Sequence, residues 1–180
     1  VFDSNRYTVF GLLTRLGCEV IDMGVVRDQP ELLEAAFVRA ACLADVIITS
    51  GGVSVGEADY TKAMMKKLGD VAFWKIAMRP GCPMAVGQIN RDKLASSPYY
   101  ISADSSTFYS SSNASTILFG LPGNPVAVMV TFLAFVRPAL LRMMGCTPSA
   151  TPLLKARSAE PIRKKPGRTE YQRGIVSQAP

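Results

Sequence analysis

The residues best suited to chemistry lie in one loop, residues 50–59, directly after an apolar stretch. Its glycines permit backbone angles closed to residues with a Cβ, so successive amides can converge on an anion. Its acids could hold a divalent cation or activate water. The candidate residues are Ser50, Gly51, Gly52, Ser54, Gly56, Glu57 and Asp59. We predict a phosphate-binding loop beside carboxylates, although a Gly-Gly pair alone is also typical of an ordinary strand-to-helix turn.

A second candidate anion site is the turn formed by Pro122, Gly123, Asn124 and Pro125. Asn124 is a typical helix cap and Pro125 suits the first helical position. Such a helix start leaves amides and the positive end of the helix dipole facing outward, where an anion could bind. A well-formed helix start without a ligand is the alternative.

The composition restricts the chemistry. The chain of 180 residues contains no histidine, which excludes Ser-His and Cys-His nucleophilic catalysis and histidine bases from it. Cys18, Cys42, Cys82 and Cys146 are scattered without a Cys-x-x-Cys pair, so we expect no zinc site and reduced thiols. Any reaction must use carboxylates, Lys, Arg or a metal.

The formal net charge of +6 is concentrated near the C-terminus, where residues 155–173 hold seven basic side chains against two acidic ones. This stretch has Tyr171 as its one aromatic residue, so we expect a solvated or anion-facing segment and no nucleic-acid partner. The longest apolar stretch, residues 126–141, is interrupted by Thr131, Arg137 and Pro138, so we expect no membrane span. With no leader pattern visible, we predict a cytoplasmic protein.

Helical and strand patterns alternate along the chain. Apolar spacing and capping residues predict helices over 5–16, from Pro30, over 59–68 and from Asn124 to Gly145 with a kink at Pro138; strands are predicted at 19–23, 46–49, 71–77, 84–89 and 117–121. The alternation predicts an α/β fold in three layers, with a mostly parallel sheet covered on both faces by helices. Ligands in such folds gather beyond the carboxyl ends of strands, where residues 50–59 fall.

The chain also shows changes of pattern that divide it. Residues 95–116 are rich in serine and predict a long surface loop. We expect one domain over residues 1–146, a linker over 147–152, and the incomplete beginning of a C-terminal β domain over 153–180.

Several sequence blocks together resemble the family of bacterial molybdopterin molybdenumtransferases, to which the C-terminal domain of gephyrin is related. The blocks, in the family's order, are Asp3-Ser4-Asn5-Arg6, Leu16-Gly17-Cys18-Glu19-Val20, Arg27-Asp28, Ser50 to Tyr60, Phe73-Trp74-Lys75, Arg79-Pro80-Gly81, Gly120 to Val126, Pro166-Gly167-Arg168 and Gln172-Arg173-Gly174. They cover nearly the whole chain, so a chance similarity is improbable.

The resemblance implies an enzyme that inserts molybdate into adenylylated molybdopterin, releases AMP and requires magnesium. It implies the three-layer molybdopterin-binding domain, followed by the start of a C-terminal β-barrel domain. It also implies an elongated homodimer whose site includes residues of the partner chain, with molybdopterin adenylyltransferase as pathway partner. A gephyrin-like scaffold without catalysis, or a nucleotide pyrophosphatase that shares this domain, are the alternatives.

The resemblance also assigns roles to residues. The loop from Ser50 to Gly56 would hold the pterin or its phosphate, Asp59 and Asp28 would be the catalytic carboxylates, and Glu57 with Asp59 would hold magnesium. Positive charge for molybdate or pyrophosphate would come from Lys75, Arg79 and Arg173, while the turn of Pro122, Gly123, Asn124 and Pro125 would shape the anion pocket. Structural roles remain as alternatives, since Lys75 could lie at a sheet edge and Asp28 could cap a helix.

The chain departs from the family in two places. One is the serine-rich stretch between Ala95 and Thr116, where relatives generally make a short turn, so we expect altered access near Pro122 without loss of the fold. The other is the turn at residues 79–83. Where relatives usually read Lys-Pro-Gly-Lys-Pro, this chain has Arg79-Pro80-Gly81-Cys82-Pro83. Arg79 keeps a positive charge, but Cys82 removes one. The turn therefore supplies one cation to the expected anion site.

Overall fold

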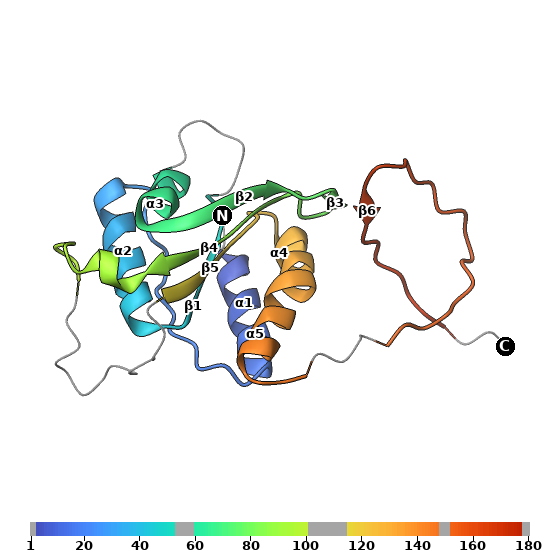
Figure 1. The fold of residues 1–180 in the computed structure, drawn as a ribbon. Helices are drawn as coiled ribbons and strands as arrows, with labels where there is room; N and C mark the ends of the chain where they lie inside the picture. The colour runs from blue at the N-terminus through green and yellow to red at the C-terminus, as the bar shows by residue number, and fades with distance from the viewer. Residues whose placement is uncertain (1–2, 53–59, 101–114, 148–151, 178–180) are drawn as a thin grey trace.

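The computed structural model of the chain describes residues 3–52, 60–100, 115–147 and 152–177 (Figure 1). The elements in chain order are α1 (Ser4–Arg15), α2 (Pro30–Leu43), β1 (Val46–Ser50), α3 (Tyr60–Leu68), β2 (Gly69–Lys75), β3 (Met78–Arg79), β4 (Pro83–Asn90), the 3₁₀ turn η1 (Arg91–Leu94), β5 (Ser115–Leu121), α4 (Pro125–Thr131), the π-helical turn η2 (Phe132–Val136), α5 (Arg137–Met143) and β6 (Thr169–Glu170).

The central sheet has the strand order β1-β5-β4-β2. β1 and β5 run parallel, whereas β4 is antiparallel to both of its neighbours. The α/β fold is confirmed, but the prediction of a mostly parallel sheet is wrong for the described strands. The reason is the short connection between β2 and β4, residues 76–82, since a parallel pair needs a crossover of about a dozen residues or more.

Helices cover both faces of this sheet, which confirms the three predicted layers (Figure 1). On one face α2 and α3 pack their buried residues, such as Phe37 and Met65, against Leu118 of β5. On the other face α1 and the α4–α5 helix pack against Phe119 of β5. Neighbouring residues of one strand thus enter opposite cores, because side chains alternate across a strand. Phe132, 1% exposed, is among the largest fully buried side chains.

The last long helix is interrupted before the proline that was expected to kink it. The π turn η2 separates α4 from α5, and Pro138 lies in the first turn of α5. Gly145 ends the helix as predicted, with φ of +79° and its amide bonded to Arg142 O at 3.1 Å. By length and composition, Pro125–Met143 is the one helix of the described chain that could cross a membrane. Its buried side chains pack on the sheet, so the absence of a membrane span remains our prediction.

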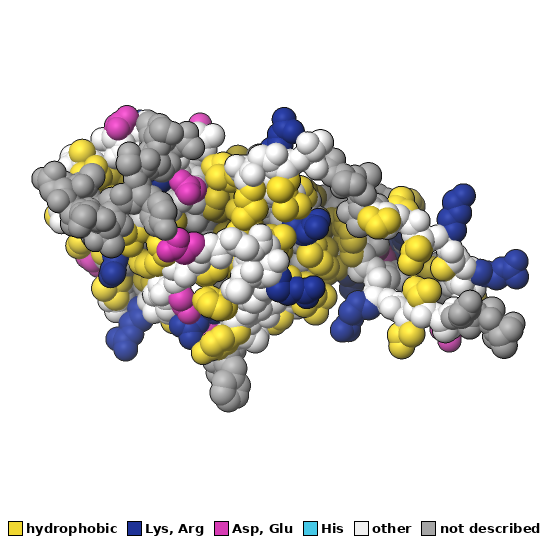
Figure 2. Space-filling view, turned by 90° about the horizontal axis from the view of Figure 1, so that it is seen from below, with side chains coloured by type: hydrophobic (Ala, Val, Ile, Leu, Met, Phe, Trp, Pro, Cys, Tyr) yellow, Lys and Arg dark blue, Asp and Glu magenta, His cyan; other side chains and the backbone are white. Residues whose placement is uncertain are grey.

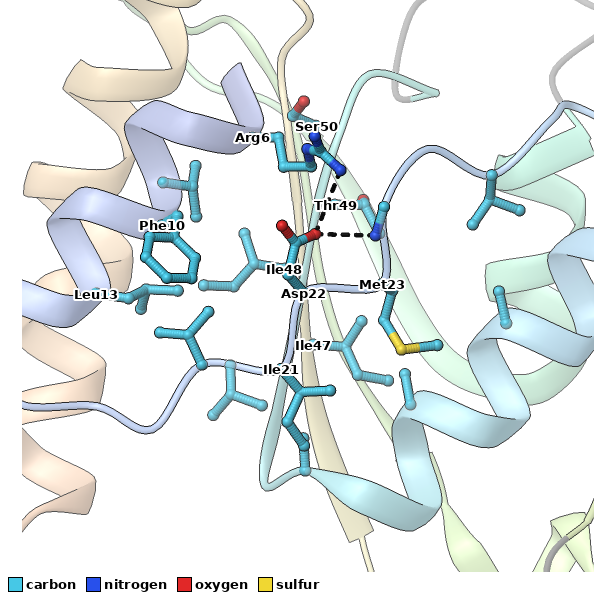
Figure 3. Close-up of a pocket in the computed structure, with 18 of the residues that line it drawn as sticks. Arg6, Phe10, Leu13, Ile21, Asp22, Met23, Ile47, Ile48, Thr49 and Ser50 are labelled. Carbon is cyan, nitrogen blue, oxygen red and sulfur yellow. Dashed lines mark hydrogen bonds and ion pairs between the residues drawn. The ribbon is translucent and has the colours of Figure 1, made fainter. Parts of the chain in front are cut away.

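The strand predicted at residues 19–23 is wrong. This segment is neither helix nor strand, although it runs beside β1 (Figure 3). A local turn explains the difference, because Asp22 Oδ1 accepts a hydrogen bond from the amide of Gly24 at 2.9 Å and Gly24 has a φ of +70°. Such a side-chain turn competes with strand pairing. Among the described strands, β1 therefore pairs with β5 alone.

The C-terminal segment, residues 152–177, lies to one side of the sheet and its helices (Figure 1). Its one described strand, β6, pairs in parallel with β3. Backbone bonds from Thr169 N to Ala77 O, 2.8 Å, and from Tyr171 N to Arg79 O, 2.9 Å, flank this pairing. The boundaries at 146 and 152, and the start of a β-barrel domain, remain predictions.

Candidate functional site

The glycine loop and the Pro122 turn meet because β1 and β5 are parallel neighbours. The register pairs Ser50 with Leu121, and Gly51 N donates to Leu121 O at 3.0 Å. A Cβ on Gly123 would lie 3.9 Å from the Cα of Gly51, which shows how closely the two turns approach. Two loops far apart in the sequence thus form one edge of a site.

Gly51 and Gly52 allow the sharp turn of the backbone that follows β1. Both residues have positive φ, +89° and +67°, which glycine adopts without a steric penalty. A Cβ on Gly52 would also lie 2.6 Å from the Cβ and Cγ2 atoms of Thr61, at the start of α3. Glycine at position 52 is therefore needed both for the backbone angle and for the close approach of α3.

A hollow of about 1370 Å³ opens beside this edge, between α1, residues 17–26, β1 and α2. Figure 3 shows that Arg6, Asp22, Thr49 and Ser50 form its polar part, while apolar side chains such as Ile48 form another wall. The predicted site residues that line it are Asp28, Ser50, Gly51, Gly52, Gly123 and Pro125. Six predicted residues from three separate parts of the chain thus share one hollow.

The remaining residues of the helix-start turn have structural tasks. Asn124 Oδ1 accepts hydrogen bonds from Val126 N at 3.0 Å and Ala127 N at 3.2 Å. Pro122 is buried behind the turn, and neither Pro122 nor Asn124 lines the hollow. The cap already occupies these two amides, so they are not free for an anion, and anion binding at this turn stays a prediction.

Asp28 lines the hollow, and the helix that follows does not use it as a cap. The N-cap of α2 is Gln29, which makes no side-chain capping bond, and Pro30 occupies the first turn. Asp28 is an exposed residue of the segment before the helix. Of the two roles considered for it, the capping role is thus excluded, and its carboxylate remains a candidate for chemistry.

The first turn of α1 contributes residues that the site prediction missed. Asn5 Nδ2 donates to Gly123 O at 2.8 Å, which ties α1 to the Pro122 turn. Arg6 forms ion pairs with Asp3 at 3.4 Å and with Asp22 at 3.6 Å. The block Asp3-Ser4-Asn5-Arg6 carried part of the family resemblance, and this was the signal that could have found them.

The charge on Arg6 is well supported by its neighbours. Its Nη2 donates to Tyr7 Oη at 3.0 Å, and its guanidinium lies 4.9 Å from the centre of the Tyr7 ring. This hydrogen bond is the main cause that raises the pKa of Arg6, with further contributions from Asp22 and Asp3, while partial burial acts in the opposite direction. Arg6 is thus a fixed positive charge at the hollow.

The predicted cations lie elsewhere. Lys75 and Arg79 do not line the first hollow, and Arg173 lines neither this hollow nor the second one. Lys75 ends β2 at the same end of the sheet as Ser50, but β5 and β4 intervene, a separation of about 14 Å at normal strand spacing. Within the described residues, Lys75, Arg79 and Arg173 therefore share no hollow with Gly51 and Gly52, and their proposed roles stay predictions.

Arg79 instead contributes to a second, basic hollow of about 630 Å³. The pairing of β3 with β6 brings Arg79 beside the C-terminal segment, whose basic side chains project from one end of the molecule in Figure 2. The hollow is lined by Arg79, Arg163, Lys164, Lys165, Pro166, Arg168 and Glu170. With five cations against one acid, it suits a small oxyanion.

Four of the predicted residues, Ser54, Gly56, Glu57 and Asp59, lie outside the described residues. Within the part of the chain that the structure describes, no group of three or more His, Cys, Asp or Glu side chains could hold a metal ion. The predicted magnesium site therefore remains a prediction.

Comparison with known proteins gives the family. Residues 1–142 match the family described as probable molybdopterin binding domain. The chain belongs to this family. The resemblance to molybdopterin molybdenumtransferases is confirmed, since the chain is 40% identical over 176 residues to a protein of that name from Haemophilus influenzae, covering 97% of this chain and 38% of the relative. A protein of the same name from Nostoc is 34% identical, over 95% of this chain and 35% of the relative.

Two further matches extend the comparison. Gephyrin from Dictyostelium discoideum is 34% identical over 68% of this chain and 16% of its own length. The crystal structure of a molybdopterin biosynthesis MoeA protein from Pyrococcus horikosii superposes with a TM-score of 0.60 at 32% identity, over 81% of this chain and 30% of that chain. The chain thus spans less than two fifths of the length of these relatives.

Proposed function

We propose that this chain is the molybdopterin-binding part of an enzyme that inserts molybdate into adenylylated molybdopterin and releases AMP. The observation that carries the proposal is the hollow at the carboxyl ends of β1 and β5, where the glycine loop, Asp28 and the Pro122 turn converge. This is where ligands bind in open α/β folds. Relatives named molybdopterin molybdenumtransferase support the reaction class.

The two hollows suit different parts of the reaction. The first, with apolar and polar walls, would hold the pterin and its phosphate near Ser50, Gly51 and Gly52. The second, lined by Arg79 and Arg168, would attract molybdate, because guanidinium groups donate charge-assisted hydrogen bonds to oxyanions. Lys75 and Arg173 belong to neither lining, so we assign them no more than a supporting charge.

The acids complete the proposal. Asp59 and Asp28 would be the catalytic carboxylates, and Glu57 with Asp59 would hold magnesium, which would neutralise charge on the substrate phosphate. The site would be completed in a homodimer, with molybdopterin adenylyltransferase supplying the substrate. We place the protein in the cytoplasm, without a nucleic-acid or membrane partner.

The test is molybdenum insertion by the complete protein that contains this chain. We expect Asp59→Ala to lower the rate of cofactor formation by about 100-fold or more, a typical effect of removing a catalytic acid or base. The matched control is Asp70→Ala, since Asp70 is an exposed residue of β2 that lines neither hollow. Near-normal turnover by the Asp59 variant would remove the catalytic assignment.

The role of the basic hollow has its own test. Arg168→Gln should raise the molybdate concentration needed for half-maximal rate by about 10-fold, because one charge-assisted contact is lost. Arg157→Gln is the control, since Arg157 is an exposed cation of the same segment outside the hollow lining. Equal molybdate dependence in both variants would place the oxyanion elsewhere.

The match to gephyrin keeps a scaffold role as the second candidate. A scaffold without catalysis would form no cofactor whatever the state of Asp59. The wild-type measurement in the same assay therefore separates the two proposals. Pyrophosphate cleavage of a dinucleotide by the same protein would instead favour the nucleotide pyrophosphatase alternative.

A further inference from the structure

Buried polar atoms that lack a hydrogen-bond partner in the described chain are concentrated at the first hollow. Across residues 3–52, 60–100, 115–147 and 152–177, the buried side-chain atoms without a hydrogen-bond partner are Asn5 Oδ1, Arg6 Nε and Thr49 Oγ1. All three residues line this hollow. A buried polar atom without a partner is costly, so a cluster of such atoms in one cavity indicates a group that binds there.

Each of these three atoms requires a particular kind of hydrogen-bond partner. Asn5 Nδ2 donates to Gly123 O, which fixes the orientation of the amide and leaves Oδ1 as an acceptor in need of a donor. Thr49 Oγ1 can donate or accept. Arg6 Nε lies 3.4 Å from Asp3 Oδ2, close enough for an ion pair but not aligned as a hydrogen bond, and it can only donate.

These requirements exclude a simple oxyanion as the occupant. A phosphate or molybdate oxygen accepts hydrogen bonds and would leave Asn5 Oδ1 without a donor. A ring edge that carries an N–H beside a carbonyl would satisfy both kinds of atom. Apolar side chains such as Ile48 and Met23 lie beside the polar groups and would contact the ring (Figure 3).

We propose that Asn5, Arg6 and Thr49 form the subsite for the N–H and carbonyl edge of the pterin ring. This inference rests on the function proposed above, whose substrate contains a pterin with such an edge. Asn5 Oδ1 accepts from the ring N–H, Arg6 Nε donates to the ring carbonyl, and Thr49 Oγ1 contacts either group. The three side chains orient the ring, and the glycine loop beside them remains available for the phosphate.

The experiment is a fluorescence titration of this chain with 6-hydroxymethylpterin. Thr49→Val keeps the shape of the side chain and removes the hydroxyl, so we expect about 5- to 10-fold weaker binding, the loss of one hydrogen bond. Thr49→Ser should restore affinity, because it returns the hydroxyl. Thr131→Val is the control, since Thr131 is buried in α4 with its hydroxyl bonded to Ala127 O at 2.7 Å, away from the hollow.

The melting temperature of Thr49→Val shows whether the variant folds, and we expect it to equal or exceed that of wild type. Equal pterin affinity in wild type and Thr49→Val, or no pterin binding by wild type, would overturn the inference. A parallel titration with AMP distinguishes the pterin from adenine as the group bound. If Thr49→Val weakens the binding of AMP but not that of the pterin, the subsite binds adenine and the inference is overturned. Cofactor formation by the complete protein tests the proposed function independently of the subsite.

Discussion

At the two ends of the β1 and β5 strand pair, buried threonine hydroxyls differ in whether they have hydrogen-bond partners. Where β5 begins, the fully buried Thr116 Oγ1 lies 3.0 Å from Ala41 O, 3.1 Å from Ala44 O and 3.1 Å from Arg91 Nε. At the carboxyl end of β1, Thr49 Oγ1 is buried without a partner in the described chain. The first end is built for stability, because polar groups there bind one another. The second end retains polar groups that a ligand can bind.

The largest expected effect on stability is at the end where β5 begins, because the buried polar groups there are hydrogen-bonded. Arg91 donates from Nε to Ala41 O at 2.8 Å and from Nη2 to Ala44 O at 2.9 Å, at the C-terminal end of α2. Arg91→Leu leaves these partly buried carbonyls with one fewer donor, and we expect a loss of about 3 kcal/mol in the free energy of unfolding. Urea unfolding measures it. The exposed neighbour Lys93→Leu is the control, with an expected change within about 0.5 kcal/mol.

A smaller effect is expected in the glycine loop, and it should differ between adjacent residues. Gly52→Ala requires an unfavourable φ and places a Cβ against Thr61, so we expect a loss of about 2 kcal/mol. Gly51→Ala meets no atom within 4 Å and should lose about 1 kcal/mol from backbone strain alone. Equal losses in thermal or urea unfolding would contradict the close approach of α3.

The sequence predicted much of this architecture but not the arrangement of its strands. Periodic apolar residues and capping residues located the helices, and the predicted α/β layers are present; the parallel pairing of β1 with β5, which brings the glycine loop to the Pro122 turn, is seen in the structure. The direction of β4 depends on a seven-residue connection, residues 76–82, and the missing strand at 19–23 depends on one Asp22 turn. Neither changes the apolar pattern, so neither could be predicted from it.

The candidate site, like the fold, was predicted from the sequence only in part. Spacing identified Ser50, Gly51 and Gly52, since loops after strands collect at one sheet edge, whereas the role of Asp28 came from the family resemblance. The separation of Lys75 from this edge depends on the strand order, which no local pattern encodes. Asn5 was missed because its role requires the contact with Gly123, 118 positions away in the chain.

The smallest expected effect concerns thiol reactivity. Burial raises the pKa of Cys18, which lines the hollow, so less thiolate is present at a given pH. We expect Cys18 to react several-fold more slowly with a maleimide at pH 7 than the exposed Cys146. The rate at Cys18 should still rise with pH up to the raised pKa. Mass spectrometry of labelled peptides measures both sites, and equal rates would indicate that the hollow does not shield its lining.

The most direct test of the contrast between the two ends is the free energy of urea unfolding of Thr49→Val and Thr116→Val. The substitution is the same and both hydroxyls are buried. We predict that Thr49→Val is as stable as wild type or up to about 1 kcal/mol more stable, because it removes a hydroxyl without a partner. Thr116→Val should lose about 1 to 2 kcal/mol, because its hydroxyl is bonded. A loss of stability in Thr49→Val equal to that in Thr116→Val would contradict the account.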